Sequence, residues 1–170
     1  DQLFFSTQKL TPQNVKKYAS LEVLAVFVHS EINDPILNQL PRLKLIATMS
    51  TGYDHIDLEA CQKRKIIVGN VPAYGENTVA EHTFALILAL SRKIIESVER
   101  TRQGSFELHG LRGFDLRGKT LGIVGCGNIG RHVVRMARGF EMKVLVCDQT
   151  KDKSLARQLG FQYARLEQLL

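Results

Sequence analysis

The fold of this chain is decided by residues 119–148, which read KTLGIVGCGNIGRHVVRMARGFEMKVLVCD. The pattern predicts four elements in order: an apolar strand at 119–124, a glycine-rich turn at 125–130, a helix at 131–140 and a second strand at 143–147. Asp148 follows the second strand directly. A G-x-G-x-x-G turn between a strand and a helix, with an acidic residue about 20 positions further on, is typical of a dinucleotide-binding unit.

Each glycine of this turn has a separate physical role. Gly125 permits the tight turn from strand to helix, Gly127 lets a pyrophosphate approach the backbone without an intervening Cβ, and Gly130 lets the helix pack closely. The unpaired amide groups at the start of the helix, including those of Asn128 and Ile129, favour a phosphate, as does the positive end of the helix dipole. The alternative interpretation is that the glycines only form a compact turn.

Asp148 indicates which dinucleotide is bound. Its carboxylate can accept hydrogen bonds from the two hydroxyls of an adenosine ribose, and its charge would repel a 2′-phosphate at the same place. The sequence therefore predicts NAD in preference to NADP. The alternative is that Asp148 only caps the next segment.

The first hundred residues alternate strand-like and helix-like segments. Strands are expected at 3–6, 23–28, 43–48 and 66–68, with helices opening at Thr11-Pro12, at Asp34-Pro35 and over 57–64. The apolar, β-branched run 23–28 is of the kind that is buried on both faces of a parallel sheet. Strands that alternate with helices predict an α/β fold with a parallel sheet.

A long helix is expected to connect two domains. It begins near Asn77 or Thr78 and continues towards Gln103. The predicted division is a substrate domain with this helix at 1–103, a return segment at 104–118, and an incomplete dinucleotide-binding domain at 119–170, ending in a strand at 161–164 and a helical run. A complete dinucleotide-binding domain has two βαβαβ halves. Only one half is expected here, so we expect the sequence to be a piece of a longer protein.

Composition excludes several classes of function. The 170 residues are 44% hydrophobic and 24% charged, with a formal net charge of +6. The basic residues are scattered, which argues against a nucleic-acid surface. The three cysteines show neither metal-site spacing nor a disulfide framework, and no apolar run is long enough to cross a bilayer. We therefore expect no metal, no membrane partner and a cytoplasmic location.

Three motifs together carry a family resemblance. They are TMSTGYDHID at 48–57, NVPAY at 70–74 with TVAEHT at 78–83, and GKTLGIVGCGNIG at 118–130. In this order they resemble the D-isomer-specific 2-hydroxyacid dehydrogenases, and the second motif resembles the D-lactate dehydrogenase branch. The resemblance covers essentially the whole chain. It implies a flavodoxin-like substrate domain, a Rossmann domain, NAD as cofactor, a small 2-keto or 2-hydroxy acid as substrate, and a homodimer when full length.

The resemblance also assigns substrate-binding residues. In that family a loop holds the substrate carboxylate with backbone amides, which here places the donors at Thr51 and Gly52, flanked by Ser50 and Tyr53. A tight turn is the alternative interpretation of this loop, with Asp57 as an N-cap, and both can be true. The resemblance further places Tyr74 in the substrate pocket, whereas the bare sequence favours a surface packing residue.

The resemblance assigns Val79 to packing near the nicotinamide ring. Glu81 and His82 are adjacent in sequence and do not face each other on a helix, so they are not expected to act as an acid–base pair. Helix-start hydrogen bonding and contact between domains are expected of them instead. The sequence supplies no partner that makes any other histidine a catalytic candidate: these are His29, His55, His109 and His132.

Chemistry in this family requires an arginine, a glutamate and a histidine in the second half of the nucleotide domain, and the resemblance assigns no residue of this chain to those roles. The implied function is NAD-dependent interconversion of a small 2-keto acid and its D-2-hydroxy acid in a cleft between domains, with these 170 residues inactive alone. Two alternatives stay open. One is an NAD(H)-sensing corepressor-type binding module, and the other is an inactive paralogue.

Overall fold

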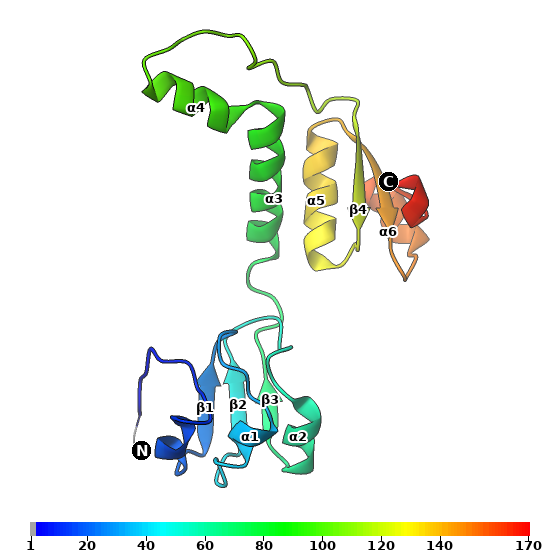
Figure 1. Ribbon diagram of the computed structural model, residues 1–170. Coiled ribbons are helices and arrows are strands. Elements are labelled where there is room, and N and C mark those ends of the chain that lie inside the picture. The colour runs from blue at the N-terminus through cyan, green and yellow to red at the C-terminus, as the bar shows by residue number, and fades with distance from the viewer. Residues whose placement is uncertain (1–2) are drawn as a thin grey trace. The chain divides into compact units, whose positions relative to one another are not determined.

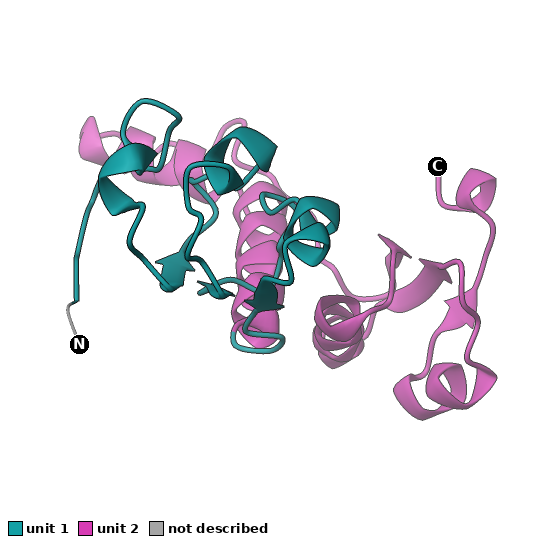
Figure 2. Ribbon diagram, turned by 90° about the horizontal axis from the view of Figure 1, so that it is seen from below, with its two compact units in different colours: residues 1–74 teal, residues 75–170 magenta. Residues whose placement is uncertain are grey.

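The computed structural model describes residues 3–170. The chain divides into two compact units, residues 1–74 and residues 75–170, which Figure 2 shows in different colours. Each unit is built around its own three-stranded parallel sheet. The α/β architecture with parallel sheets is therefore confirmed.

The first unit has three strands in chain order, β1-β2-β3. Its elements are the 3-10 helix η1 (Val15–Tyr18), β1 (Val23–Val26), α1 (Asp34–Leu37), β2 (Leu45–Thr48), α2 (Leu58–Lys63) and β3 (Ile67–Gly69). Leu45 is in register with Val23 on one side and with Ile67 on the other. The carboxyl ends of the three strands therefore lie at one edge of the sheet, where the segments after β2 and β3 meet (Figure 1).

Both α-helices of this unit begin at side-chain caps. Asn33 accepts a hydrogen bond from the Ile36 amide at 3.3 Å, and Asp57 accepts one from the Ala60 amide at 2.9 Å. Each cap satisfies an amide that the first helical turn leaves unpaired. The predicted N-cap role of Asp57 is confirmed.

Three expectations for this unit were wrong. Residues 3–6 form no strand, and Pro12 lies in a turn that precedes η1 instead of opening an α-helix at Thr11. The N-cap residue of η1 is Asn14, whose Oδ1 accepts the Thr11 amide at 2.9 Å. The run 23–28 is not buried on both faces, because β1 alternates between exposed and buried residues, with Val23 55% exposed and Leu24 8% exposed. The core of this unit covers only one face of β1.

The second unit pairs its strands in the order β4-β5-β6, all parallel. Its elements are α3 (Glu76–Ser91), α4 (Ile94–Arg102), β4 (Thr120–Val124), α5 (Asn128–Gly139), β5 (Lys143–Cys147), α6 (Lys153–Leu159), β6 (Gln162–Tyr163) and the 3-10 helix η2 (Leu166–Gln168). α5 lies between the sheet and α3 (Figure 1). Phe84 of α3 stacks on Phe140 at the end of α5, with ring centroids 5.3 Å apart.

The single long helix expected from Asn77 or Thr78 to Gln103 is interrupted. α3 ends at Ser91, and Lys93 adopts a left-handed conformation with φ 55° before α4 begins. The cause is a distant contact, because the Ser91 carbonyl accepts the Phe114 amide at 2.9 Å. Gly113 allows this approach, since a Cβ there would lie 1.9 Å from the Ser91 oxygen. α3 therefore packs within the second unit, whereas the sequence assigned it to the first domain.

Candidate functional site

The predicted glycine turn joins β4 to α5 in the second unit. Gly125 adopts φ +86°, a conformation that L-residues with a Cβ rarely adopt, and its amide donates to the Cys147 carbonyl at 2.8 Å. A Cβ on Gly130 would lie 2.4 Å from the Gly125 oxygen, so the first turn of α5 packs against the loop with no space to spare. A Cβ on Gly127 would meet nothing within 4 Å. The protein itself therefore leaves the space beside Gly127 open.

The start of α5 presents unpaired backbone donors. The first helical hydrogen bond runs from the Arg131 amide to the Gly127 carbonyl at 3.0 Å. Within residues 3–170, no acceptor is bonded to the amides of the four residues before Arg131: Gly127, Asn128, Ile129 and Gly130. Four free amides at the positive end of a 12-residue helix fit a diphosphate, and the open space beside Gly127 gives it room to approach.

Asp148 lies at the end of β5 beside this turn. Its Oδ2 accepts the Cys126 amide at 2.6 Å, and its Oδ1 accepts the Thr150 amide at 3.0 Å. These bonds, that from Cys126 first, hold the pKa of the Asp148 carboxyl below its usual value. Each carboxylate oxygen retains capacity for another hydrogen bond. The half-buried Asp148 can therefore accept two further hydroxyls, as a ribose diol would require.

The start of α3 contacts the same turn. Asn128 Nδ2 donates to Glu76 Oε1 at 3.4 Å, a long hydrogen bond between the first turns of α5 and α3. Val79 follows Glu76 by three residues and is 49% exposed. Glu81 accepts a long bond from Asn77 Nδ2 at 3.4 Å, and both Glu81 and His82 are exposed. The expected helix-start hydrogen bond of Glu81 is therefore present.

In the first unit, the loop Ser50–Tyr53 follows β2, and all four of its carbonyls are held by protein donors, that of Tyr53 by the Ile56 amide at 2.9 Å. The Ser50 carbonyl accepts the Val71 amide at 3.1 Å, the Thr51 carbonyl accepts Asn70 Nδ2 at 2.8 Å, and the Gly52 carbonyl accepts Ser50 Oγ at 2.7 Å. Thr51 Oγ1 also donates to the Val71 carbonyl at 2.9 Å. The loop is thus fixed to the segment that follows β3.

These contacts orient the amides of the loop. The peptides in the described part of the chain are all trans, so each N–H points opposite to the carbonyl of the preceding residue. The amides of Thr51, Gly52 and Tyr53 therefore point away from the groups that hold the carbonyls. No acceptor within the described range is bonded to any of the three, and all three residues are exposed. Three consecutive free amides are suited to an anion such as a carboxylate.

A buried polar cluster supports this loop. Thr48 Oγ1 lies 2.6 Å from Ser50 Oγ and 3.2 Å from His55 Nε2. The sequence supplies no partner for His55, and the structure shows that Thr48 is that partner. Asn70 had no predicted role either. Its contact with Thr51 follows from the register of β2 and β3, in which Ala47 pairs with Gly69, so that the residues after both strands leave the sheet at the same edge.

Tyr74 is the last residue of the first unit and is 61% exposed. Its hydroxyl makes no hydrogen bond to residues 3–170. Both observations are compatible with a side chain that is available to a ligand. Arg117 is also at the surface, where it forms an exposed ion pair with Glu141 at 2.9 Å.

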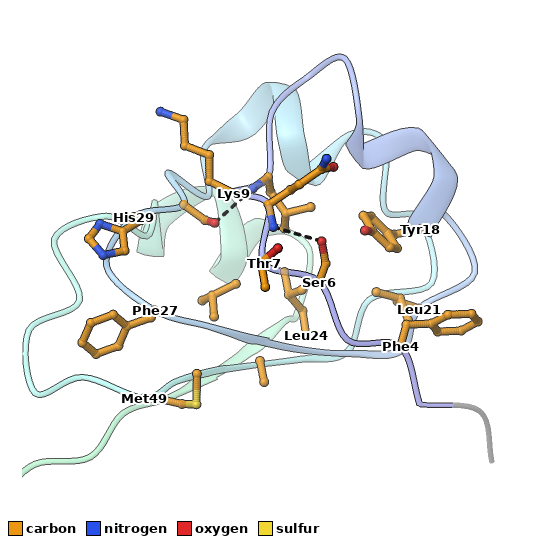
Figure 3. A pocket seen from close by; sticks show the side chains of 15 residues that line it. Phe4, Ser6, Thr7, Lys9, Tyr18, Leu21, Leu24, Phe27, His29 and Met49 are labelled. Atoms are coloured by element: carbon orange, nitrogen blue, oxygen red, sulfur yellow. Dashed lines mark hydrogen bonds between the residues drawn. The ribbon is translucent and has the colours of Figure 1, made fainter.

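A separate cavity of about 270 Å³ lies in the first unit between residues 4–10 and β1. Its apolar lining includes Phe4, Leu24 and Phe27 (Figure 3). Backbone bonds to Ser6 Oγ and Ser30 Oγ, at 3.2 and 3.1 Å, hold its rim. The cavity includes none of the predicted site residues, so it is distinct from the loop Ser50–Tyr53.

Within the described residues, no group of three or more His, Cys, Asp or Glu side chains could hold a metal ion, and no helix is long and apolar enough to span a membrane. The three cysteines are free thiols. Burial raises the pKa of the Cys126 thiol in the glycine turn, so this thiol stays protonated at neutral pH.

Comparison with known proteins gives one consistent family. Residues 2–157 match the family described as D-isomer specific 2-hydroxyacid dehydrogenase, catalytic domain. The chain is 38% identical over 162 residues to a 2-hydroxyacid dehydrogenase homolog of Haemophilus influenzae, covering 94% of this chain and 49% of that protein. It is 34% identical over 163 residues to a glyoxylate reductase of Pyrococcus furiosus, covering 92% and 48%.

A solved structure agrees with these relatives. D-lactate dehydrogenase from Aquifex aeolicus, complexed with NAD and lactic acid, matches with a TM-score of 0.85 and 38% identity, covering 95% of this chain and 48% of that chain. The chain thus spans about half the length of the curated relatives it matches.

Proposed function

Because the chain belongs to the D-isomer-specific 2-hydroxyacid dehydrogenase family, we propose that the protein is an NAD-dependent oxidoreductase that interconverts a small 2-keto acid and the D-2-hydroxy acid. Pyruvate and D-lactate are the proposed pair, because the Pro72-Ala73-Tyr74 motif resembles the D-lactate dehydrogenase branch. The 170 residues supply the carboxylate-binding loop and the adenosine end of the cofactor site. The proposed functional division is 1–103 as substrate domain, 104–118 as return segment and 119–170 as nucleotide domain, and it differs from the division by packing, in which α3 belongs to the second unit.

The observation that carries this proposal is the set of free amides at Thr51, Gly52 and Tyr53. Their carbonyls and side chains are held so that the donors face away from the protein, which is the preorganised form of an anion site. Binding the carboxylate through backbone amides fixes the orientation of the acid without a charged side chain. Tyr74 adds a hydroxyl donor and an apolar ring on the substrate side.

The second unit fits NAD on its own geometry. The free amides of α5 would hold the pyrophosphate, the open space beside Gly127 would admit it, and Asp148 would accept the ribose hydroxyls while repelling a 2′-phosphate. Val79 would pack near the nicotinamide ring. NAD supplies the hydride chemistry when it is bound. The residues of this chain bind and orient. Three roles are assigned to further residues of the full-length enzyme: an Arg that holds the carboxylate and polarises the carbonyl, a His that exchanges a proton with the 2-hydroxyl, and a Glu that orients this His.

The experiment compares the 170-residue chain with the full-length enzyme in an assay of NADH oxidation. The full-length enzyme is expected to reduce pyruvate with a higher kcat/KM than glyoxylate and to prefer NADH over NADPH. The 170-residue chain is expected to show no turnover with either acid. Turnover by the 170-residue chain would overturn the assignment of catalysis to further residues, and a full-length protein that binds NADH but reduces no 2-keto acid would overturn the proposed reaction.

A further inference from the structure

A chain of hydrogen bonds runs beneath the loop that carries the free amides. It links His55 Nε2 to Thr48 Oγ1 at 3.2 Å, Thr48 Oγ1 to Ser50 Oγ at 2.6 Å, and Ser50 Oγ to the Gly52 carbonyl at 2.7 Å. Thr48 is 2% and Ser50 3% exposed, so water does not compete for these contacts. A buried and fully connected polar network of this kind specifies a single local geometry.

Both ends of the chain of hydrogen bonds are anchored. Thr48 is the last residue of β2 and pairs with Val26 of β1. The His55 carbonyl accepts the Ile32 amide at 2.7 Å, and the Ile32 carbonyl accepts the Asp57 amide at 2.9 Å. The carbonyl of His55 is therefore held by Ile32, which fixes the backbone from which its ring reaches Thr48.

Counting protons determines the direction of the chain. The Gly52 carbonyl can only accept, so Ser50 Oγ must donate its one proton to it. Ser50 Oγ must then accept from Thr48, which uses the one proton of the Thr48 hydroxyl. Thr48 Oγ1 must in turn accept from His55, so His55 Nε2 carries a proton. Every other arrangement leaves one of the three short contacts without a proton between its atoms.

From this chain we infer that Thr48 and His55 are positioning residues, which act through Ser50 to hold the Gly52–Tyr53 peptide with its amide directed at the substrate carboxylate. Because His55 Nε2 donates to Thr48 Oγ1, the Thr48 hydroxyl is directed to donate to Ser50. The Ser50 hydroxyl is then directed to donate to the Gly52 carbonyl. The peptide is trans, so the Tyr53 amide points away from the buried cluster. The inference rests on the proposed function in one respect, namely that the anion is the carboxylate of the acid.

The first test uses kinetics of the full-length enzyme. Thr48→Val removes the hydroxyl at nearly constant volume and is expected to raise KM for pyruvate roughly three- to tenfold, the scale of one hydrogen bond, with little change in kcat. Thr48→Ser restores the hydroxyl and should restore KM. Ile46→Val on the same strand is a matched control for lost packing, since Ile46 is fully buried but outside the chain of hydrogen bonds, and its KM should not change.

A double-mutant cycle tests whether Thr48 acts through Ser50. Thr48→Val should raise KM for pyruvate fully when Ser50 is present, and should not raise KM further in the Ser50→Ala background. Independent, multiplying effects of the two substitutions on KM would overturn the relay, as would an equal effect of Thr48→Val and Thr48→Ser.

The second test needs neither a substitution nor turnover. Nitrogen NMR of the 170-residue chain at about pH 8 reports which ring nitrogen of His55 carries a proton. His55 is expected to carry its proton on Nε2, and an unprotonated Nε2 would overturn the inference even if the variants fail to fold.

Titration with lactate then separates the inference from the proposed function. Shifts of the Thr51, Gly52 and Tyr53 amides on adding lactate support both. If lactate leaves these amides unmoved while His55 shows the Nε2–H tautomer and Thr48→Val shifts the Tyr53 amide, the positioning chain stands and the proposed carboxylate ligand is wrong.

Discussion

Replacing Gly130 with alanine tests the packing of the glycine turn that is proposed to bind the nucleotide. The new Cβ would lie 2.4 Å from the Gly125 oxygen, whereas real Cβ contacts essentially never fall below 3.0 Å, so backbone must move by at least about 0.6 Å. The Gly125 backbone cannot yield easily, because it is already held at φ +86° and bonded to Cys147. Overpacking of this kind lowers the free energy of unfolding by about 1–3 kcal/mol. The higher helix propensity of alanine offsets up to about 1 kcal/mol of this loss.

We therefore expect Gly130→Ala to lower the free energy of unfolding of the second unit by about 1–2 kcal/mol. Urea unfolding followed by hydrogen exchange of α5 measures this unit separately from the first. Gly127→Ala is the matched control, because its Cβ meets nothing within 4 Å. Gly127 is the N-cap residue of α5, where alanine is less favourable than glycine. Alanine also reduces the conformational entropy of the unfolded chain, which is stabilising. The two effects roughly offset each other, so the free energy of unfolding should change by less than about 0.5 kcal/mol.

The two variants should separate stability from cofactor binding. Gly127→Ala places a Cβ in the space proposed for the pyrophosphate and should weaken NAD binding by the full-length enzyme while leaving its stability nearly unchanged. A Gly130→Ala protein as stable as the wild type would refute the packing argument. Equal destabilisation by both substitutions would show that the two glycines do not have different roles.

Four further expectations concern the side chains of Asp148, Asp57 and Tyr74. Asp148→Ala should weaken NAD binding by about 1–3 kcal/mol in calorimetry, and an unchanged affinity would remove Asp148 from the site. The Cys126 amide lowers the pKa of the Asp148 carboxyl in the folded protein. The contribution of this carboxylate to folding stability is therefore complete above the unfolded pKa of about 3.9 and is lost as the pH falls through the lower folded pKa. Between about pH 5 and pH 8, NAD affinity should accordingly show no titration of this group. Asp57→Ala should destabilise the first unit by about 1 kcal/mol in urea unfolding, and Asp57→Asn should recover most of that loss. Tyr74→Phe should raise KM for pyruvate without a matching fall in kcat, and an unchanged KM would leave Tyr74 without a substrate role.

The sequence predicted the strands of the second unit to within one or two residues. Their apolar runs and flanking glycines are local signals, and β5 was predicted at its observed bounds. The start of α5 was placed three residues late, because the turn that carries the free amides already belongs to the helix at Asn128. The break at Lys93 was not predictable from local sequence. It depends on Phe114 and Gly113, which approach Ser91 from more than twenty residues away.

The candidate substrate loop shows the same division between local and distant information. Its position after β2 could be predicted from the resemblance, but the reason for its free amides could not. Those amides are free because Asn70 and Val71, about twenty residues later, hold the carbonyls, and because Ser50 turns back onto Gly52. A hydrogen bond between residues so far apart depends on strand register, which the apolar pattern leaves undetermined.

The two proposed anion sites, the loop Ser50–Tyr53 and the start of α5, present the same arrangement of backbone groups, and this has a consequence for substrate choice. In the loop Ser50–Tyr53 and at the start of α5, the carbonyls are satisfied within the protein and the amides are left over. Backbone amides distinguish an anion from a neutral group, but not pyruvate from glyoxylate, which differ by one methyl group beyond the carboxylate. A methyl group in an apolar pocket is worth about 1–3 kcal/mol of discrimination. Selectivity between these acids must therefore come from side chains that contact the methyl group. The candidates are the exposed rings of Tyr53, in the proposed carboxylate-binding loop, and of Tyr74, at the end of the motif at 70–74.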